Sequence, residues 1–116
     1  MRETLKRVEI VRHRRVVRAV ITVGQKVDTQ LFTLRYLARS PQPLPRRIAF
    51  HLNSKIGGAV VRNRLKRRLR EIYRRNKNWF PEGYDYIIQV RTGAELLGFE
   101  QLRQEIRKLT EQVPKC

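Results

Sequence analysis

The sequence concentrates positive charge in one stretch, residues 59–75, which reads AVVRNRLKRRLREIYRR. Its last fourteen positions hold eight arginines or lysines and one acid, Glu71. Guanidinium and ammonium groups at this density could neutralise and position a row of phosphates. A solvated helix face usually has acids four residues from its bases, and like charges at that spacing destabilise a free helix by about 0.2 to 0.5 kcal/mol per pair. We therefore interpret the stretch as a polyanion-binding surface.

Two glycines, Gly57 and Gly58, precede this stretch, and Lys55 lies close to them in the chain. The glycines could let a phosphate approach the positive N-terminus of a following helix. They could equally serve only a tight turn between a strand and that helix. The sequence lacks the GxxxxGK[ST] pattern of a phosphate-binding loop, so both interpretations stay open.

The sequence offers little for catalysis by the chain itself. A nuclease usually needs clustered carboxylates to hold metal ions, or a histidine pair for acid–base chemistry, and the ten acids here are dispersed. His13 lies among arginines, where a phosphate contact or plain solvation is the simpler role, and His51 alternates with apolar residues as a structural histidine would. The single cysteine, Cys116, permits neither an intrachain disulfide nor a cysteine zinc site. We expect no catalytic residue, no metal site and no tightly bound cofactor.

The whole chain is strongly basic, with 27 Lys and Arg against 10 Asp and Glu and a formal charge of +17. Such a charge favours a polyanionic partner, and physical reasoning alone leads to nucleic acid without separating RNA from DNA. The length of 116 residues predicts one domain, with flexible tails at about 1–11 and 113–116. The absence of a signal-like or membrane-spanning apolar run predicts a cytoplasmic protein.

Hydrophobic periodicity predicts the elements that would carry this charge. Apolar spacing predicts a helix from about Val8 to Gly24, although the β-branched residues of VVRAVITV favour a strand. Strands are expected at 31–37 and 46–52, with a surface loop at 40–45 between them. A helix then runs from Ala59 to between 76 and 80, followed by a strand at 84–90 that is apolar enough to be buried on both faces. The last helix has a core stripe of Phe99, Leu102, Ile106 and Leu109, with Val113 one further step along.

The central helix separates into two faces on a helical wheel. One is a core stripe: Val61, Leu65, Leu69 and Ile72. The other is a polar arc: Arg62, Asn63, Lys66, Arg67, Arg70 and Arg74. The arc is too polar to be buried, so it should present its charges to a ligand.

Residues 54–74, SKIGGAVVRNRLKRRLREIYR, resemble the signature of the bacterial ribonuclease P protein component, which runs roughly K-x-G-x-A-V-x-R-N-x-x-K-R-x-x-R-E. The fixed positions are matched by Lys55, Gly57, Ala59, Val60, Arg62, Asn63, Lys66, Arg67, Arg70 and Glu71. The similarity continues in LFTLRY after Gly24, in RRIAF and in YDYIIQVRTGAE, and covers about residues 12–110.

The resemblance implies a fold and a function. The fold would be an α/β (α+β) two-layer sandwich, a small mixed sheet with helices, whose strand–helix–strand crossover is left-handed although about 98% of such crossovers are right-handed. The chain would be the protein subunit of ribonuclease P, the endoribonuclease that removes the 5′ leader from precursor tRNA. A catalytic RNA with bound Mg²⁺ would carry out the hydrolysis. The protein, a monomer on its own, would bind that RNA and the substrate leader and strengthen substrate binding.

The resemblance also assigns residues to two RNA sites. The RNA-binding set is Lys55, Arg62, Asn63, Lys66, Arg67, Arg70 and Arg74. The leader would lie in a cleft between the first helix and the sheet, at Val17, Ile21, Phe32 and Arg35. The family commonly has aromatics at the positions of Val17 and Ile21, so aliphatic contacts and the plane of Arg35 would replace base stacking here.

Two other functions share this composition. A non-enzymatic structural RNA-binding protein, such as a small ribosomal protein, would have similar size, charge and fold class. A self-sufficient metal-dependent nuclease would need the carboxylate cluster that the sequence lacks. The R-N-x-x-K-R-x-x-R-E register favours the ribonuclease P subunit over both.

Overall fold

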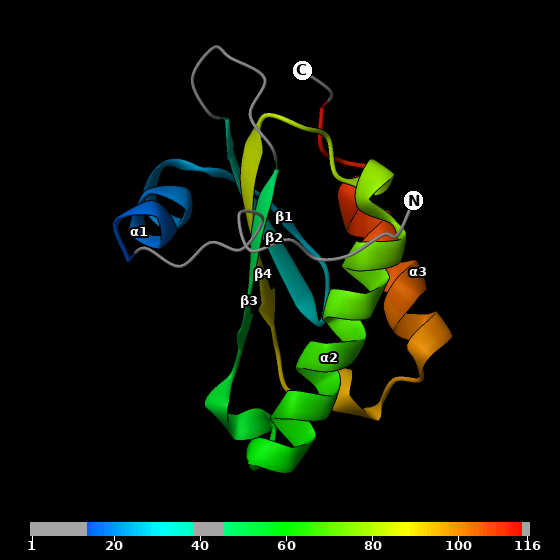
Figure 1. Cartoon of the computed structure of the whole chain (residues 1–116). Coiled ribbons are helices and arrows are strands. Elements are labelled where there is room, and N and C mark those ends of the chain that lie inside the picture. Colours follow the sequence, from blue (N-terminus) through cyan, green and yellow to red (C-terminus); the bar gives the residue numbers. More distant parts are fainter. Residues whose placement is uncertain (1–13, 39–45, 115–116) are drawn as a thin grey trace.

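The structure is a computed structural model and describes residues 14–38 and 46–114. The predicted loop at 40–45, His13 and the beginning of the predicted first helix lie outside these residues. The elements are α1 (Arg14–Val23), β1 (Gln25–Asp28), β2 (Phe32–Ala38), β3 (Arg47–Leu52), the 3-10 turn η2 (Ser54–Ile56), α2 (Ala59–Arg75), η3 (Lys77–Trp79), β4 (Tyr84–Val90), η4 (Ala94–Leu96) and α3 (Phe99–Thr110) (Figure 1).

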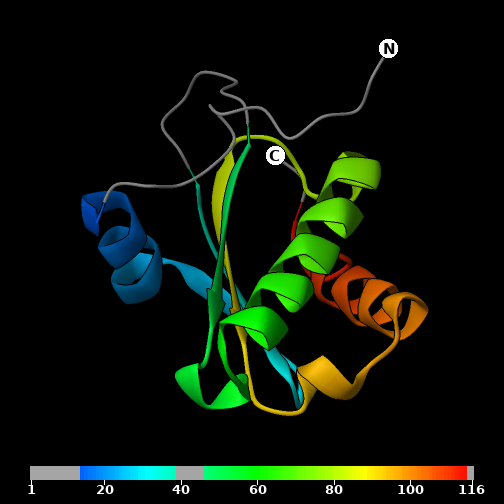
Figure 2. The same ribbon diagram turned by 60° about the horizontal axis from the view of Figure 1, so that its bottom comes forward.

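The four strands form one mixed sheet in the order β1-β2-β4-β3. β2 pairs antiparallel with β1 and β4, and β3 pairs parallel with β4. Helices α2 and α3 cover one face of the sheet, while α1 lies against the other face (Figures 1 and 2). β4 is therefore covered on both sides, and six of its seven residues are buried, as its apolar sequence predicts.

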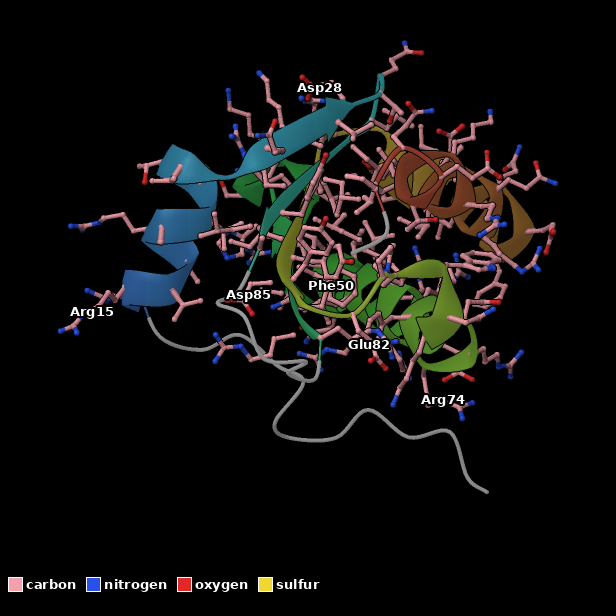
Figure 3. The ribbon with its side chains drawn as sticks, turned by 90° about the horizontal axis from the view of Figure 1, so that it is seen from above. Arg15, Asp28, Phe50, Arg74, Glu82 and Asp85 are labelled. Atoms are coloured by element: carbon pink, nitrogen blue, oxygen red, sulfur yellow. The ribbon has the colours of Figure 1, made fainter. Side chains whose placement is uncertain are left out.

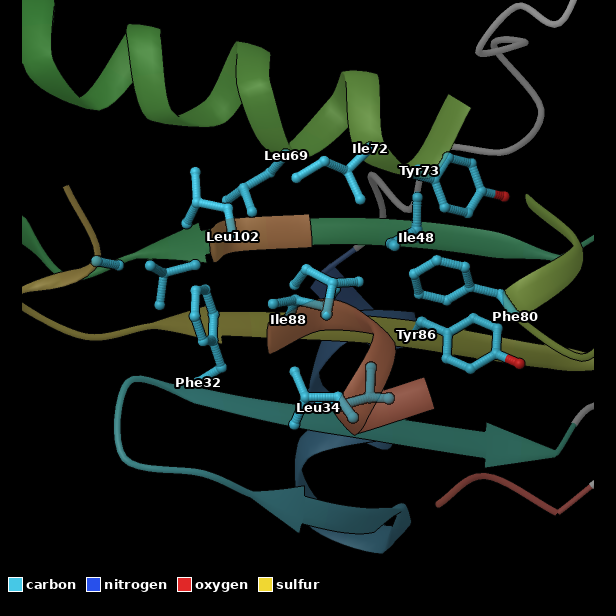
Figure 4. Packing of buried hydrophobic residues seen from close by; sticks show 14 of the residues in the cluster. Phe32, Leu34, Ile48, Leu69, Ile72, Tyr73, Phe80, Tyr86, Ile88 and Leu102 are labelled. Atoms are coloured by element: carbon cyan, nitrogen blue, oxygen red, sulfur yellow. The ribbon is translucent and has the colours of Figure 1, made fainter. Parts of the chain in front are cut away.

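The crossover from β3 through α2 to β4 joins neighbouring parallel strands. Seen from the side of α2 and α3 with both strands pointing upward, β4 lies to the left of β3 (Figure 4). The connection is therefore left-handed, as the family resemblance predicts and against the general preference.

The main core lies between the sheet and helices α2 and α3 (Figure 4). On α2 the predicted stripe is confirmed: Leu65, Leu69 and Ile72 are buried, and Val61 packs at the margin of the core. The sheet contributes alternate residues of each strand, since successive side chains of a strand point to opposite faces. These are Phe32, Leu34 and Tyr36 of β2, Ile48 of β3, and Tyr84, Tyr86, Ile88 and Val90 of β4.

Helix α3 presents its predicted stripe to this core, with Leu102, Ile106 and Leu109 buried. Val113, expected at the start of a flexible tail, is buried as well, and Tyr84 donates a hydrogen bond to the carbonyl of Pro114 at 2.9 Å. The tail prediction is therefore wrong at positions 113 and 114, because the apolar periodicity of α3 continues past the end of the helix.

Helix α1 ends at the predicted glycine. The backbone N–H of Gly24 donates to the carbonyl of Val20 at 3.0 Å. A Cβ at this position would lie 2.7 Å from the carbonyl oxygen of Tyr36, so the close approach of helix and sheet requires glycine. The chain then enters β1, a strand that the sequence did not predict because its four residues, QKVD, contain a single apolar side chain.

Candidate nucleic-acid interface

An open cavity of about 410 Å³ lies on the basic face of α2. Burial of the opposite stripe fixes the rotation of the helix and turns this face to solvent. Five of the seven predicted RNA-binding residues line the cavity together with Glu71: Asn63, Lys66, Arg67, Arg70 and Arg74. Figure 3 shows Arg74 pointing outward from α2, away from the sheet.

Glu71 forms ion pairs with some of the cations near the end of α2 and leaves others unpaired. Its carboxylate accepts hydrogen bonds from Arg74 and from Arg75, the latter at 2.6 Å. These contacts, with Arg74 the larger, lower the pKa of Glu71 to about 2, so it stays ionised near neutral pH. Within the described residues Arg67 and Arg70 form no hydrogen bond or ion pair, so they are the cations most available to an incoming phosphate.

The other two predicted residues do not line the cavity. Lys55 is exposed on η2, where its backbone N–H donates to the side chain of Asn53 at 2.9 Å. Arg62 is half-buried, and its Nε has no hydrogen-bond partner among the described residues. The N-terminus of α2 lacks a side-chain cap, and Gly57 has a φ of 154° with its missing Cβ position 3.1 Å from Val61. The glycine is thus accounted for by the turn itself.

The second face of the sheet carries α1. The contact is made by Val20 and by Ile87 of β4, which are both fully buried, while Val17 and Ile21 are half-buried. Figure 3 shows the alternation of the sheet directly, since Asp85 points to the side of α1 and Phe50 to the side of α2. Asp85 is held there by a two-pronged ion pair with Arg47, at 2.8 and 2.9 Å.

Arg35 lies on this second face, as predicted, and connects α1 to the sheet. Its guanidinium donates to the carbonyl of Ile21, in the last turn of α1, at 3.2 Å, and to Oε1 of Gln89 at 2.7 Å. A cation at the C-terminal end of a helix also interacts favourably with the helix dipole.

The prediction that Phe32 lines this cleft is wrong. Phe32 is fully buried and points into the core beneath α2 and α3, on the opposite face of the sheet from Arg35. The two residues are three positions apart on one strand, and side chains separated by an odd number of positions point to opposite faces. Of the four predicted cleft residues, the structure brings together Val17, Ile21 and Arg35.

A second cavity, of about 300 Å³, opens on the sheet at the carboxyl ends of β3 and β4. Its lining residues are Thr33, His51, Leu52, Asn53, Gln89, Val90 and Arg91. Thr33, Gln89 and His51 form a row across three strands, because Thr33 pairs with Gln89 and Gln89 with His51. The sequence prediction missed this cavity. The sequence pattern that could have indicated it is a polar residue between two apolar neighbours, as in Phe50-His51-Leu52 and Ile88-Gln89-Val90.

His51 differs from the structural histidine that its position suggested. It is exposed, and it forms no hydrogen bond within the described residues. Partial burial and the nearby charge of Lys66 lower its pKa, so the ring is neutral near pH 7. His51 lines the second cavity and Lys66 lines the α2 cavity, so the charge of Lys66 acts on a residue of the other cavity.

Residues 14–38 and 46–114 contain no group of three or more His, Cys, Asp or Glu side chains that could hold a metal ion. No helix in this part of the chain is long and apolar enough to cross a membrane. A cation-rich helix face and a polar cavity on a small mixed sheet are typical of a nucleic-acid-binding protein of the α+β class.

Comparison with known proteins identifies the family. The family model for ribonuclease P matches residues 5–114. A ribonuclease P protein component from Petrotoga mobilis is 33% identical over 115 residues, covering 96% of both chains, and one from Citrifermentans bemidjiense is 41% identical over 83 residues, covering 72% of this chain and 69% of the relative. The solved ribonuclease P protein of Thermotoga maritima superposes with a TM-score of 0.81 at 26% identity, covering 91% of this chain and 98% of the other. The chain belongs to the ribonuclease P protein family.

Proposed function

We propose that the chain acts as the protein subunit of ribonuclease P, which removes the 5′ leader from precursor tRNA in the cytoplasm. The observation that carries this proposal is the set of cations in the α2 cavity that form no ion pair within the described residues, Lys66, Arg67 and Arg70, which stand at positions that match the family signature. Arg67 and Arg70 can each donate hydrogen bonds to a phosphate without first breaking an internal ion pair. Lys66 and Asn63 extend the same surface.

The α2 cavity and the α1 side of the sheet suggest a division of labour between two RNA partners. The α2 face, which is rich in cations, suits the backbone of a folded RNA such as the catalytic subunit. The face of the sheet that carries α1, with the half-buried Val17, Ile21 and Arg35, suits the extended single strand of a leader. In this arrangement His51 and Lys66 lie at the junction between the two RNAs.

Phosphodiester hydrolysis would be carried out by the catalytic RNA with its bound Mg²⁺. The part played by this chain is to position the leader and to reduce repulsion between two polyanions. Cations that release counterions from both RNAs strengthen the complex most at low ionic strength. The protein should therefore lower the Mg²⁺ concentration at which cleavage is efficient.

The test is cleavage of 5′-labelled precursor tRNA at low Mg²⁺, with a bacterial ribonuclease P RNA present or absent and the protein added or withheld. Cleavage at the mature 5′ end that needs both components supports the proposal and leaves the chemistry with the RNA. Cleavage by the protein alone would indicate an autonomous nuclease. A protein that binds the RNA without stimulating cleavage would instead be a structural RNA-binding protein.

A further inference from the structure

The cavity at the carboxyl ends of β3 and β4 is built differently from the cationic face of α2. At about 300 Å³ it is near the lower end of the range for small-ligand pockets, which is roughly 300 to 1,000 Å³. Five of its seven lining residues are polar, while the side chains of Leu52 and Val90 pack into the core on the opposite face of the sheet. A crevice at the carboxyl ends of strands is also where open α/β sheets usually bind ligands.

Some of the polar groups in this cavity are already engaged. The hydroxyl of Thr33 donates to Asp28, and the guanidinium of Arg91 donates to Asp28, Thr33 and the carbonyl of Thr29. These bonds hold the β1–β2 hairpin to the end of β4. They leave Arg91 with less capacity for a ligand than the unpaired arginines of α2.

Two side-chain amides are left with free donors. Oε1 of Gln89 accepts from Arg35 at 2.7 Å, and because arginine can only donate, the oxygen must face Arg35 and the amino group must point away from it. Oδ1 of Asn53 accepts from the backbone N–H of Lys55 at 2.9 Å, which fixes that amide in the same way. Among the described residues, neither amino group has an acceptor within hydrogen-bond distance.

The side-chain amide of Gln89 is oriented by Arg35, which is itself held in place by a second hydrogen bond. Arg35 is held at its other end by the carbonyl of Ile21, so the end of α1, Arg35 and Gln89 form one chain of contacts. The cavity therefore presents two neutral amide donors. A phosphate would bind more strongly to the free cations of α2, whereas neutral donors suit the edge of a nucleobase.

We propose that this cavity selects a leader nucleotide whose base carries a keto oxygen rather than an amino group. This inference rests on the proposed function, since it places the leader on the α1 side of the sheet, the side on which Arg35 contacts Gln89. Guanine offers O6 and N7 as neighbouring acceptors to the amino groups of Gln89 and Asn53, whereas adenine presents a donating amino group at the same place. Gln89 is the specificity-determining residue, and Arg35 is a positioning residue that fixes its amide.

The test uses the assembled holoenzyme and a series of precursor tRNAs in which one leader nucleotide at a time is inosine or adenosine. These bases differ in the keto or amino group at C6 and in the proton at N1. At one leader position, inosine should bind about three- to tenfold more tightly than adenosine, the range expected for one net hydrogen bond. Gln89→Glu keeps an acceptor for Arg35 and removes the free donor, so it should reverse the preference toward adenosine.

Gln104→Glu is the matched control, because Gln104 is exposed on α3 and the substitution makes the same change of charge. It should leave the inosine preference unchanged. Equal binding of inosine and adenosine at every position, in a holoenzyme that binds and cleaves, would overturn this inference and leave the proposed function intact. Equal losses on both analogues in Gln89→Glu would assign the amide to a phosphate and also overturn it. A protein that failed to stimulate cleavage at all would overturn both.

Discussion

Removing two cations from the α2 cavity tests the interface quantitatively. The double variant Arg67→Gln with Arg70→Gln removes two exposed guanidinium groups that have no partner among the described residues, so the folded chain loses no internal ion pair. Each phosphate contact contributes about 0.7 to 0.9 to the slope of log affinity against log salt concentration. Loss of both contacts should therefore flatten the slope by about 1.4 to 1.8.

The assay is the affinity for a bacterial ribonuclease P RNA, measured over a fourfold range of salt, roughly 50 to 200 mM. Across that range the wild type should lose about seven- to twelvefold more affinity than the variant. The matched control is Arg64→Gln with Arg68→Gln, which makes the same change of charge on the same helix outside the cavity. An unchanged slope in the cavity variant, or an equal change in the control, would refute the assignment of the cavity as the phosphate site.

Three further predictions concern the core, an ion pair and the leader groove. Leu65→Asp should unfold the domain because Leu65 is 3% exposed in the core, whereas Arg64→Ala, on the solvent side of the same helix, should leave the melting temperature nearly unchanged; circular dichroism separates them, and two similar melting curves would contradict the assigned helix faces. Since the folded-state pKa of Glu71 is lowered to about 2, its carboxylate stabilises the fold above its ordinary pKa of 4.5 and loses that effect as the pH falls toward about 2; Glu71→Gln should melt below the wild type near neutral pH, with the difference closing in acid, and a difference that did not vary with pH would reject the ion pairs. Val17→Ala and Ile21→Ala should weaken binding of precursor tRNA and spare mature tRNA, and equal losses on both substrates would give these residues a purely structural role.

The central helix could be predicted closely from the sequence because helical periodicity is a local property. The apolar stripe of Leu65, Leu69 and Ile72 fixes one face, and the cations follow on the other. The strand at 84–90 was predicted at its observed bounds for a similar reason, since its run of apolar residues is continuous. The left-handed crossover was different, because the family resemblance predicted it and general rules of chain topology would have given the opposite hand.

The second cavity could not be predicted because it depends on pairing between distant segments. Thr33, Gln89 and His51 become neighbours only through the register of three strands, and no local pattern encodes that register. The error at Phe32 is of another kind, since two-residue alternation already separates its face from that of Arg35. The family resemblance placed Phe32 and Arg35 in one cleft because they are close in the sequence, whereas the alternation of side chains along a strand puts them on opposite faces of the sheet.

The position of β4 between two layers has a consequence for how this chain can change over evolutionary time. Its even-numbered residues, from Tyr84 to Val90, belong to the core under α2 and α3, while Asp85, Ile87 and Gln89 face the layer of α1. Mutational tolerance along these seven residues should therefore alternate, with loss of folded protein at even positions and altered α1 packing or substrate choice at odd ones. A lineage could thus retune which leaders it prefers through Gln89 while inheriting an unaltered core.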